Sequence, residues 1–185
     1  ASNAGAGLPV KGIVTKVTQL LESPERSGPG VLNYNQPSAE GWKVSVLNVM
    51  GTADGLIPYG GGTSSVFRGD DSFQLMSSLD SMATWAAHDG CDGDPEVTED
   101  HITDMGDFTA TKYKYNNCDD GTIVEHYAIH GGGHNSGRVT IDNVPMTYEI
   151  TYDFIWRCEA GGETPTPPTP TVPSPPVSPP VESPV

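Results

Sequence analysis

The stretch VSVLNVMGTADGLIPY, residues 44–59, decides the fold that we expect for this chain. It begins with a short apolar run that is rich in valine and is closed by Gly51, and such a run is typical of a buried strand in a parallel sheet. In open α/β sheets the chemistry gathers at the carboxyl ends of the strands. Asp54 lies in the tight loop after this strand, so we interpret it as a candidate functional acid.

A second stretch, TIVEHYAIHGGGHNSG at residues 122–137, repeats the pattern of a strand followed by glycines. It carries His134, about eighty residues after Asp54. An acid and then a histidine, in this chain order, fit the second and third members of a Ser…Asp…His triad. The sequence contains no G-x-S-x-G motif, which would carry the nucleophilic serine of such a triad.

Length and charge limit the classes of function. The chain has 185 residues and a formal net charge of -15 at pH 7. This length favours one domain plus a tail, and the negative charge argues against nucleic acid or an anionic membrane surface as a partner. No apolar stretch approaches the roughly 20 residues that span a bilayer. The chain begins with Ala1 and shows no leader pattern, so we interpret it as a piece of a longer or processed product.

A helix is predicted within FQLMSSLDSMATWAAHDG, residues 73–90, where apolar residues recur at intervals of three to four. Ser77 or Ser78 can cap its start, and Gly90 can cap its end. Because it lies between two expected parallel strands, it completes a βαβ unit, which is nearly always right-handed.

The segments around this unit are less regular. Residues 108–115 alternate in polarity and predict a hairpin with residues 122–129. We interpret the acidic residues 91–107 as irregular loop. Residues 148–158 predict a final helix. The side chains of this helix that we expect in the core are Ile150, Phe154, Ile155 and Trp156.

Residues 163–185 differ from the rest of the chain, because they contain ten prolines interspersed with threonine, serine and valine. Such a segment favours polyproline II conformation and forms no core, and its hydroxyl residues suggest O-glycosylation. We therefore divide the chain into a folded domain, residues 1–162, and a disordered Pro-rich linker, residues 163–185. Spacers of this kind join modules of secreted proteins, so we expect a further domain after the linker and an extracellular location.

The three cysteines leave one thiol unpaired within the chain. Cys91 and Cys118 both lie in turn sequences rich in Gly, Asp and Asn, which suits a surface disulfide. Cys158 could pair with a cysteine upstream of this sequence. Three free thiols are the alternative.

Four segments in this order resemble one family: GTADGLIPY at residues 51–59, TWAAHDGC at 84–91, NNCDDGTIVEHYAIHGGGH at 116–134 and YDFIWRC at 152–158. Together they are similar to the C-terminal half of secreted feruloyl esterases and polyhydroxybutyrate-depolymerase-type esterases. The resemblance covers roughly residues 8–158. It implies the C-terminal portion of an α/β-hydrolase fold, which is a mostly parallel sheet with flanking helices.

By position, this resemblance implies that Asp54 is the triad acid, that His134 is the general base and that Cys91 and Cys118 form a disulfide. It places the nucleophilic serine upstream of Ala1, which accounts for the missing G-x-S-x-G motif. Without the serine and the backbone amide that follows it, this chain alone is expected to be inactive. Loss of the neighbouring strands would also leave an open sheet edge that favours aggregation.

Two residues are candidates for the substrate pocket. Tyr59 follows the Asp54 loop and either lines an acyl pocket or packs in the core. After His134 the family tends to have a Trp-Pro-Gly type of sequence, whereas this chain has Asn135-Ser136-Gly137. We therefore expect a different pocket rim, with Asn135 as the second candidate.

Metal and cofactor sites are not expected. His126, His130 and His134 recur every four residues, but on a strand the first two would lie about 13 Å apart at ~3.3 Å per residue. That separation is too large for one ion held at about 2 Å. The acidic residues 89–104 lack the alternating ligand pattern of a calcium loop.

The resemblance therefore favours a secreted serine carboxylic-ester hydrolase without a cofactor, acting on a polysaccharide-linked or polymeric ester. The ester itself stays open among feruloylated or acetylated polysaccharides, polyhydroxyalkanoates and smaller esters. The alternative is a non-catalytic secreted module that binds polysaccharide or associates with the cell wall.

Overall fold

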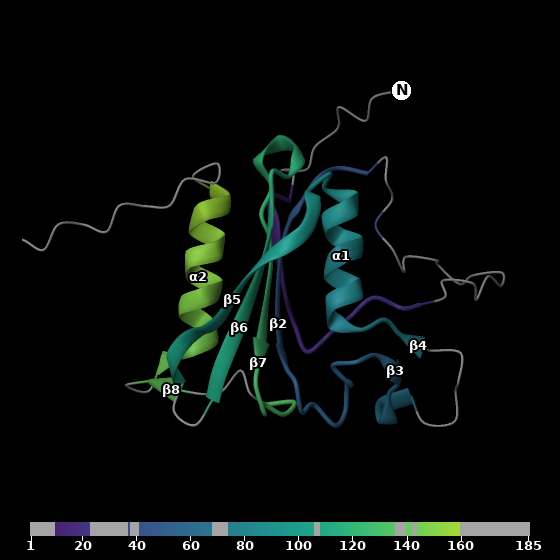
Figure 1. Ribbon diagram of the computed structural model, residues 1–185, viewed down its shortest axis with the longest axis vertical. Coiled ribbons are helices and arrows are strands. Elements are labelled where there is room, and N and C mark those ends of the chain that lie inside the picture. Colours follow the sequence, from purple (N-terminus) through teal and green to yellow (C-terminus); the bar gives the residue numbers. More distant parts are fainter. Residues whose placement is uncertain are drawn as a thin grey trace, which may run out of the picture.

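The computed structural model describes residues 10–22, 37, 41–67, 74–105, 108–135, 140–141 and 144–159. A central sheet lies between two helices, α1 (Ser78–His88) on one face and α2 (Met146–Glu159) on the other (Figure 1). Neither helix in this described part has the length and apolar character needed to cross a bilayer. The predicted linker, residues 163–185, lies outside the described residues and stays a prediction.

The sheet has five strands in the order β1-β2-β7-β6-β5. β1, β2 and β7 run parallel, whereas β6 is antiparallel to both β7 and β5. The fold is therefore mixed α/β, and the expectation of a mostly parallel sheet holds for one half of it. The strand bounds are β1 Gly12–Lys16, β2 Ser45–Gly51, β5 Asp92–Met105, β6 Phe108–Asn116 and β7 Val124–Ile129.

Short elements complete the described structure. β3 (Gly62–Thr63) pairs with β4 (Gln74–Leu75), and β8 (Thr140–Ile141) pairs with β9 (Val144–Pro145). Two single turns of 3-10 helix are η1 (Ser65–Phe67) and η2 (Asp119–Gly121).

β2 is buried at all seven positions, as its apolar run predicted. Successive side chains of a strand point to opposite faces of the sheet. Leu47 accordingly packs with Phe154 of α2, whereas Val46 packs with Met82 of α1. Burial on both faces is typical of a central strand. The loop that carries Asp54 begins at the carboxyl end of β2.

The predicted helix in residues 73–90 is confirmed as α1. Ser77 is its N-cap, and the Ser77 hydroxyl accepts a 3.0 Å hydrogen bond from the amide of Asp80. Gly90 follows the last turn with φ of +67°, a left-handed conformation that glycine adopts without a steric penalty. β2 and β7 are parallel neighbours, as the predicted βαβ unit requires, but the connection between them carries the antiparallel hairpin β5–β6 as well as α1.

Two expectations are wrong. Residues 92–105, expected as irregular loop, form β5, which pairs with β6 through Val97 and Tyr113 among others. This edge strand keeps residues 96–99 exposed, so the carboxylates of Glu96 and Glu99 stay in water while the backbone pairs. On α2, Ile150 and Phe154 are buried as expected, but Ile155 and Trp156 are each 50% exposed. They follow Phe154 by 100° and 200° around a helix of 3.6 residues per turn, which turns them away from the sheet.

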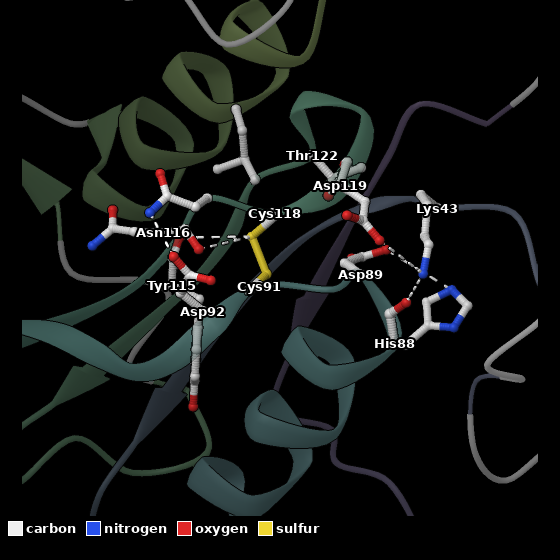
Figure 2. Close-up of a disulfide and its surroundings, with 12 residues drawn as sticks. Lys43, His88, Asp89, Cys91, Asp92, Tyr115, Asn116, Cys118, Asp119 and Thr122 are labelled. Carbon is white, nitrogen blue, oxygen red and sulfur yellow. Dashed lines mark hydrogen bonds and ion pairs between the residues drawn. A yellow bond between two sulfur atoms is a disulfide. The ribbon is translucent and has the colours of Figure 1, made fainter.

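The disulfide expected between Cys91 and Cys118 is present (Figure 2). It joins the segment that follows α1 to the turn between β6 and β7. Beside it, the ammonium group of Lys43 donates to the carbonyl of His88 and lies 3.6 Å from a carboxylate oxygen of Asp119. The disulfide and this ion pair together hold the C-terminal end of α1 against the sheet.

A buried ion cluster connects α2 to the sheet. The carboxylate of Glu125 on β7 is fully buried and accepts two hydrogen bonds from the guanidinium of Arg157, at 2.9 and 2.7 Å. Lys112 of β6 lies 3.0 Å from the same carboxylate. Burial alone raises the pKa of Glu125, but the two cations outweigh it, and the pKa lies below its usual range. A buried charge is tolerated only when it is paired in this way.

Candidate active site

The candidate site forms where the parallel strands β2 and β7 end side by side. Gly51, the last residue of β2, is the register partner of Ile129, the last residue of β7. The amide of Thr52 donates to the carbonyl of Ile129 at 2.9 Å, and the amide of Ala53 donates to the carbonyl of Gly132 at 2.9 Å. The two loops that leave these strands are therefore bonded to each other before either reaches its functional residue.

Glycine at position 51 allows this close approach. A Cβ atom at Gly51 would lie 2.1 Å from the carbonyl oxygen of Gly132, which is far inside van der Waals contact. Gly131, at the turn of the facing loop, has φ of +68°. The two glycines are thus required for different reasons. Gly51 leaves room for the facing loop because it has no side chain, and Gly131 adopts a left-handed turn.

Asp54 lies at the centre of the site. Its side chain is fully buried, and its Oδ1 atom accepts hydrogen bonds from the amides of Leu56, at 2.8 Å, and Ile57, at 3.0 Å. Burial raises the pKa of the carboxyl, but the amides of Ile57 and Leu56 and the contact with His134 outweigh it, and the pKa falls below its usual value. Asp54 is therefore held as a carboxylate although it is out of water.

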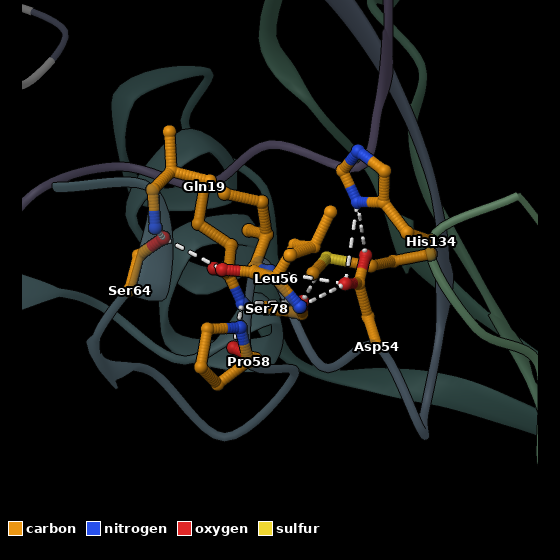
Figure 3. A network of polar contacts seen from close by, with 10 residues as sticks. Gln19, Asp54, Leu56, Pro58, Ser64, Ser78 and His134 are labelled. Atoms are coloured by element: carbon orange, nitrogen blue, oxygen red, sulfur yellow. Dashed lines mark hydrogen bonds and ion pairs between the residues drawn. The ribbon is translucent and has the colours of Figure 1, made fainter. Parts of the chain in front are cut away.

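His134 faces this carboxylate (Figure 3). Its Nδ1 atom lies 3.0 Å from Oδ2 and 3.2 Å from Oδ1 of Asp54, and its side chain is 34% exposed. Because a carboxylate only accepts hydrogen bonds, Nδ1 carries the proton and donates it to Asp54. In the neutral ring Nε2 is then the basic nitrogen. This arrangement can accept a proton at Nε2 and stabilise the resulting imidazolium with Asp54.

The two residues predicted for a substrate pocket lie in different surroundings. Tyr59 is half-buried, and its hydroxyl is 2.9 Å from Nε2 of His126, a residue on β7. Asn135 is exposed and follows His134 directly. The structure therefore brings Asp54 and His134 into contact, and the substrate role of Tyr59 and Asn135 stays a prediction.

The histidines of the four-residue repeat have separate partners. His126 contacts Tyr59, and His130 contacts the hydroxyl of Thr111 at 2.7 Å. Among the residues that the structure describes, no three His, Cys, Asp or Glu side chains gather as metal ligands would.

A cavity of about 440 Å³ lies elsewhere, between the start of β1 and α2. Gly12, Phe154 and Cys158 are among its lining residues, and it shares none with the Asp54–His134 site. Cys158 is a free, half-buried thiol whose pKa is raised by burial. Its pairing with an upstream cysteine stays a prediction.

Sequence reasoning missed the polar contacts that hold the loop after Asp54. Gln19, Ser64 and Ser78 each bond to residues 56–59 of that loop or to one another (Figure 3). Gln19 lies in a segment after β1 that is neither helix nor strand, and the serines resemble ordinary cap and turn residues. No local pattern in the sequence could have identified this group.

The fold and this geometry define a mixed α/β protein in which a buried carboxylate contacts a partly exposed imidazole at the carboxyl ends of adjacent parallel strands. The chain matches no protein-family model. It is similar to feruloyl esterase B from Piromyces equi, with 33% identity over 126 residues. The match covers 64% of this chain and 22% of that relative, so the chain spans about a fifth of the relative's length. The resemblance to feruloyl esterases is confirmed by this distant similarity.

Proposed function

We propose that this chain carries the acid and the base of a serine ester hydrolase. The observation that supports this most directly is the contact between Nδ1 of His134 and the buried carboxylate of Asp54. An acid held ionised at one strand end, facing a partly exposed imidazole at the next, matches the roles of the second and third triad members. The similarity to feruloyl esterase B favours ester hydrolysis over other uses of the same pair.

In the proposed reaction, a serine from a part of the protein upstream of these residues attacks the ester carbonyl. Nε2 of His134 accepts the serine proton as the carbon–oxygen bond forms, and Asp54 stabilises the imidazolium. The imidazolium then returns the proton to the leaving alcohol, which gives an acyl-enzyme and the first product. Water, activated by the same His134, hydrolyses the acyl-enzyme and restores the serine.

The finer features are proposed on the same basis. Residues 1–162 form part of an α/β-hydrolase domain that lacks the nucleophile, and they are inactive alone. Residues 163–185 form a linker. The substrate is a feruloyl or related ester of a polysaccharide, or a polyester, and neither metal nor cofactor takes part. Extracellular location is supported by the Cys91–Cys118 disulfide, because disulfides persist in oxidising compartments.

Fluorophosphonate labelling of the complete protein, followed by mapping of the labelled peptide, tests this function. We expect a label on a serine upstream of Ala1. We also expect Asp54→Asn to lower kcat for methyl ferulate by about 10⁴-fold, as the equivalent change does in a serine protease. Asp120→Asn, an exposed carboxylate on the turn before β7, is the matched control and should retain activity.

Near wild-type turnover in the Asp54→Asn variant would assign the acid role to another carboxylate. Absence of any label on the folded protein would favour the non-catalytic alternative, and binding to insoluble polysaccharide would then be the measurement that supports it.

A further inference from the structure

The position of the Asp54 carboxylate depends on the conformation of the loop that follows it, residues 55–61, which we call the acid loop. Two consecutive amides of this loop, from Leu56 and Ile57, point at Oδ1 of Asp54. The next residue, Pro58, has no amide proton, so it cannot extend this row of donors. The position of the two amides depends on what fixes the acid loop on either side of them. The hydroxyl of Ser64 donates to the carbonyl of Leu56 at 2.6 Å, and the carbonyls of Pro58 and Tyr59 accept the remaining contacts, including a backbone bond from Ser78 to Tyr59.

The side chain of Gln19 reaches the acid loop at this point (Figure 3). Its Nε2 atom lies 2.9 Å from the carbonyl oxygen of Pro58 and 3.1 Å from that of Tyr59. It also lies 2.9 Å from the hydroxyl oxygen of Ser78, the first residue of α1. One side chain thus joins the acid loop to the start of a helix that packs on the sheet.

The orientation of the Gln19 amide follows from chemistry. Carbonyl oxygens only accept hydrogen bonds, so the nitrogen and not the oxygen of the amide must face Pro58 and Tyr59. The amide has two N–H groups for three acceptors, so one N–H is shared. Its Oε1 atom is buried and accepts no hydrogen bond from any described residue. The side chain is therefore arranged for donation alone.

The backbone that carries Gln19 is itself fixed on both sides. The side-chain amide of Asn48, on β2, donates to the carbonyl of Thr18 at 3.0 Å. The amide of Leu20 donates to the hydroxyl of Ser81, on α1, at 3.1 Å. The segment after β1 is tied to β2 and to α1, so Gln19 can act as a rigid support for the acid loop.

We propose that Gln19 is a positioning residue, which fixes the acid loop so that the amides of Leu56 and Ile57 hold the Asp54 carboxylate against His134. The proposal rests on the function proposed above, because the positioned group is the acid of the reaction. A misplacement of about 1 Å in a catalytic arrangement lowers turnover by roughly 10²-fold. Loss of the three Gln19 hydrogen bonds should therefore lower kcat between about 10- and 100-fold and leave KM nearly unchanged.

Gln19→Met in the complete protein tests the proposal. Methionine has a similar length and volume but no donor, so packing is retained and the hydrogen bonds are lost. Thr18→Ala is the matched control, because Thr18 is the exposed neighbour in the same segment. The readouts are kcat and KM for methyl ferulate, and hydrogen exchange of the acid loop measured by mass spectrometry.

We expect the Gln19→Met variant to show the stated fall in kcat and faster exchange of the Leu56 and Ile57 amides, with both readouts unchanged in the control. A purely structural role for Gln19 would lower the melting temperature but leave kcat and loop exchange of the folded protein intact, and that result would overturn the proposal. If the methionine variant does not fold, Gln19→Asn, which withdraws the amide by one methylene, should show the same two effects, and unchanged values there would also overturn it.

The Asp54→Asn variant separates this proposal from the proposed function. Full activity of Asp54→Asn would contradict the proposed function, whereas the exchange measurement would still decide whether Gln19 fixes the loop. Inactive Asp54→Asn together with fully active Gln19→Met would contradict the positioning role alone.

Discussion

Acidification should destabilise this protein through one buried histidine before its surface carboxylates are fully protonated. His126 lies on β7 with no exposed surface, and its ring lies 5.6 Å, centroid to centroid, from the rings of both Tyr59 and Tyr113. Burial lowers the pKa of His126 from 6.5 to about 4. The folded protein therefore keeps this imidazole neutral at a pH where the unfolded chain has already bound a proton.

The size of the effect follows from linkage between protonation and folding. The unfolded state binds the extra proton below pH 6.5 and the folded state only near pH 4, so stability is lost as the pH falls between these values. A difference of one pKa unit corresponds to about 1.36 kcal/mol. The free energy of unfolding should therefore fall by about 2 kcal/mol at pH 5 and by about 3 kcal/mol at pH 4, relative to pH 7.5, through this one group.

Guanidinium denaturation at pH 7.5, 6 and 5 measures this loss in the wild type and in His126→Gln. Glutamine can still form a hydrogen bond with the Tyr59 hydroxyl, as donor or acceptor, but it does not titrate. The carboxylates common to both proteins cancel in the comparison. We expect the wild type to lose about 2 kcal/mol more than the variant between pH 7.5 and pH 5. Equal losses in the two proteins would refute the argument from burial, as would an NMR titration of His126 near pH 6.5.

Three further substitutions test other parts of the structure. Gly51→Ala forces the loops after β2 and β7 apart and should lower kcat by roughly 10²-fold, whereas wild-type kcat would contradict the close approach. Replacing both Cys91 and Cys118 by serine opens a loop of 27 residues and should lower the unfolding free energy by about 3–4 kcal/mol, as measured by denaturation without reductant. Arg157→Met leaves Glu125 with Lys112 as its remaining cation and should lower the same free energy by about 3–5 kcal/mol; an unchanged denaturation midpoint would show that the ion cluster contributes little.

The elements that the sequence predicted well are specified by residues within them or directly beside them. The strand β2 was predictable because burial on both faces requires the near-continuous apolar run of residues 44–50. α1 was predictable because Ser77 and Gly90 occupy the two positions where a helix needs a polar cap and a left-handed residue. Asp54 and His134 could be chosen because each follows such a strand, and their contact then follows from neighbouring strands that end together.

The failures have a different physical origin, because they depend on partners far along the chain. β5 is rich in acidic residues, and only its pairing with β6 makes it a strand. The exposure of Ile155 and Trp156 depends on which side of α2 meets the sheet, and that is decided by Phe154 and by the ion pair of Arg157. Gln19 was missed for the same reason: its three acceptors lie 39 to 59 residues away.

The register of β2 against β7 limits how this protein can change over evolution. The hairpin β5–β6 and the helix α1 lie between these strands in the sequence. β6 pairs with β7, where Ala110 is the partner of Ile129, but the tip of the hairpin between β5 and β6 does not enter that pairing. Insertions or deletions at the tip of that hairpin should therefore be neutral for the distance between Asp54 and His134. A single inserted residue within β7 would instead move its end by about 3.3 Å and reverse the direction of its side chains. Natural length variation between β2 and β7 should accordingly gather at the tip of that hairpin and be absent from β2, β6 and β7.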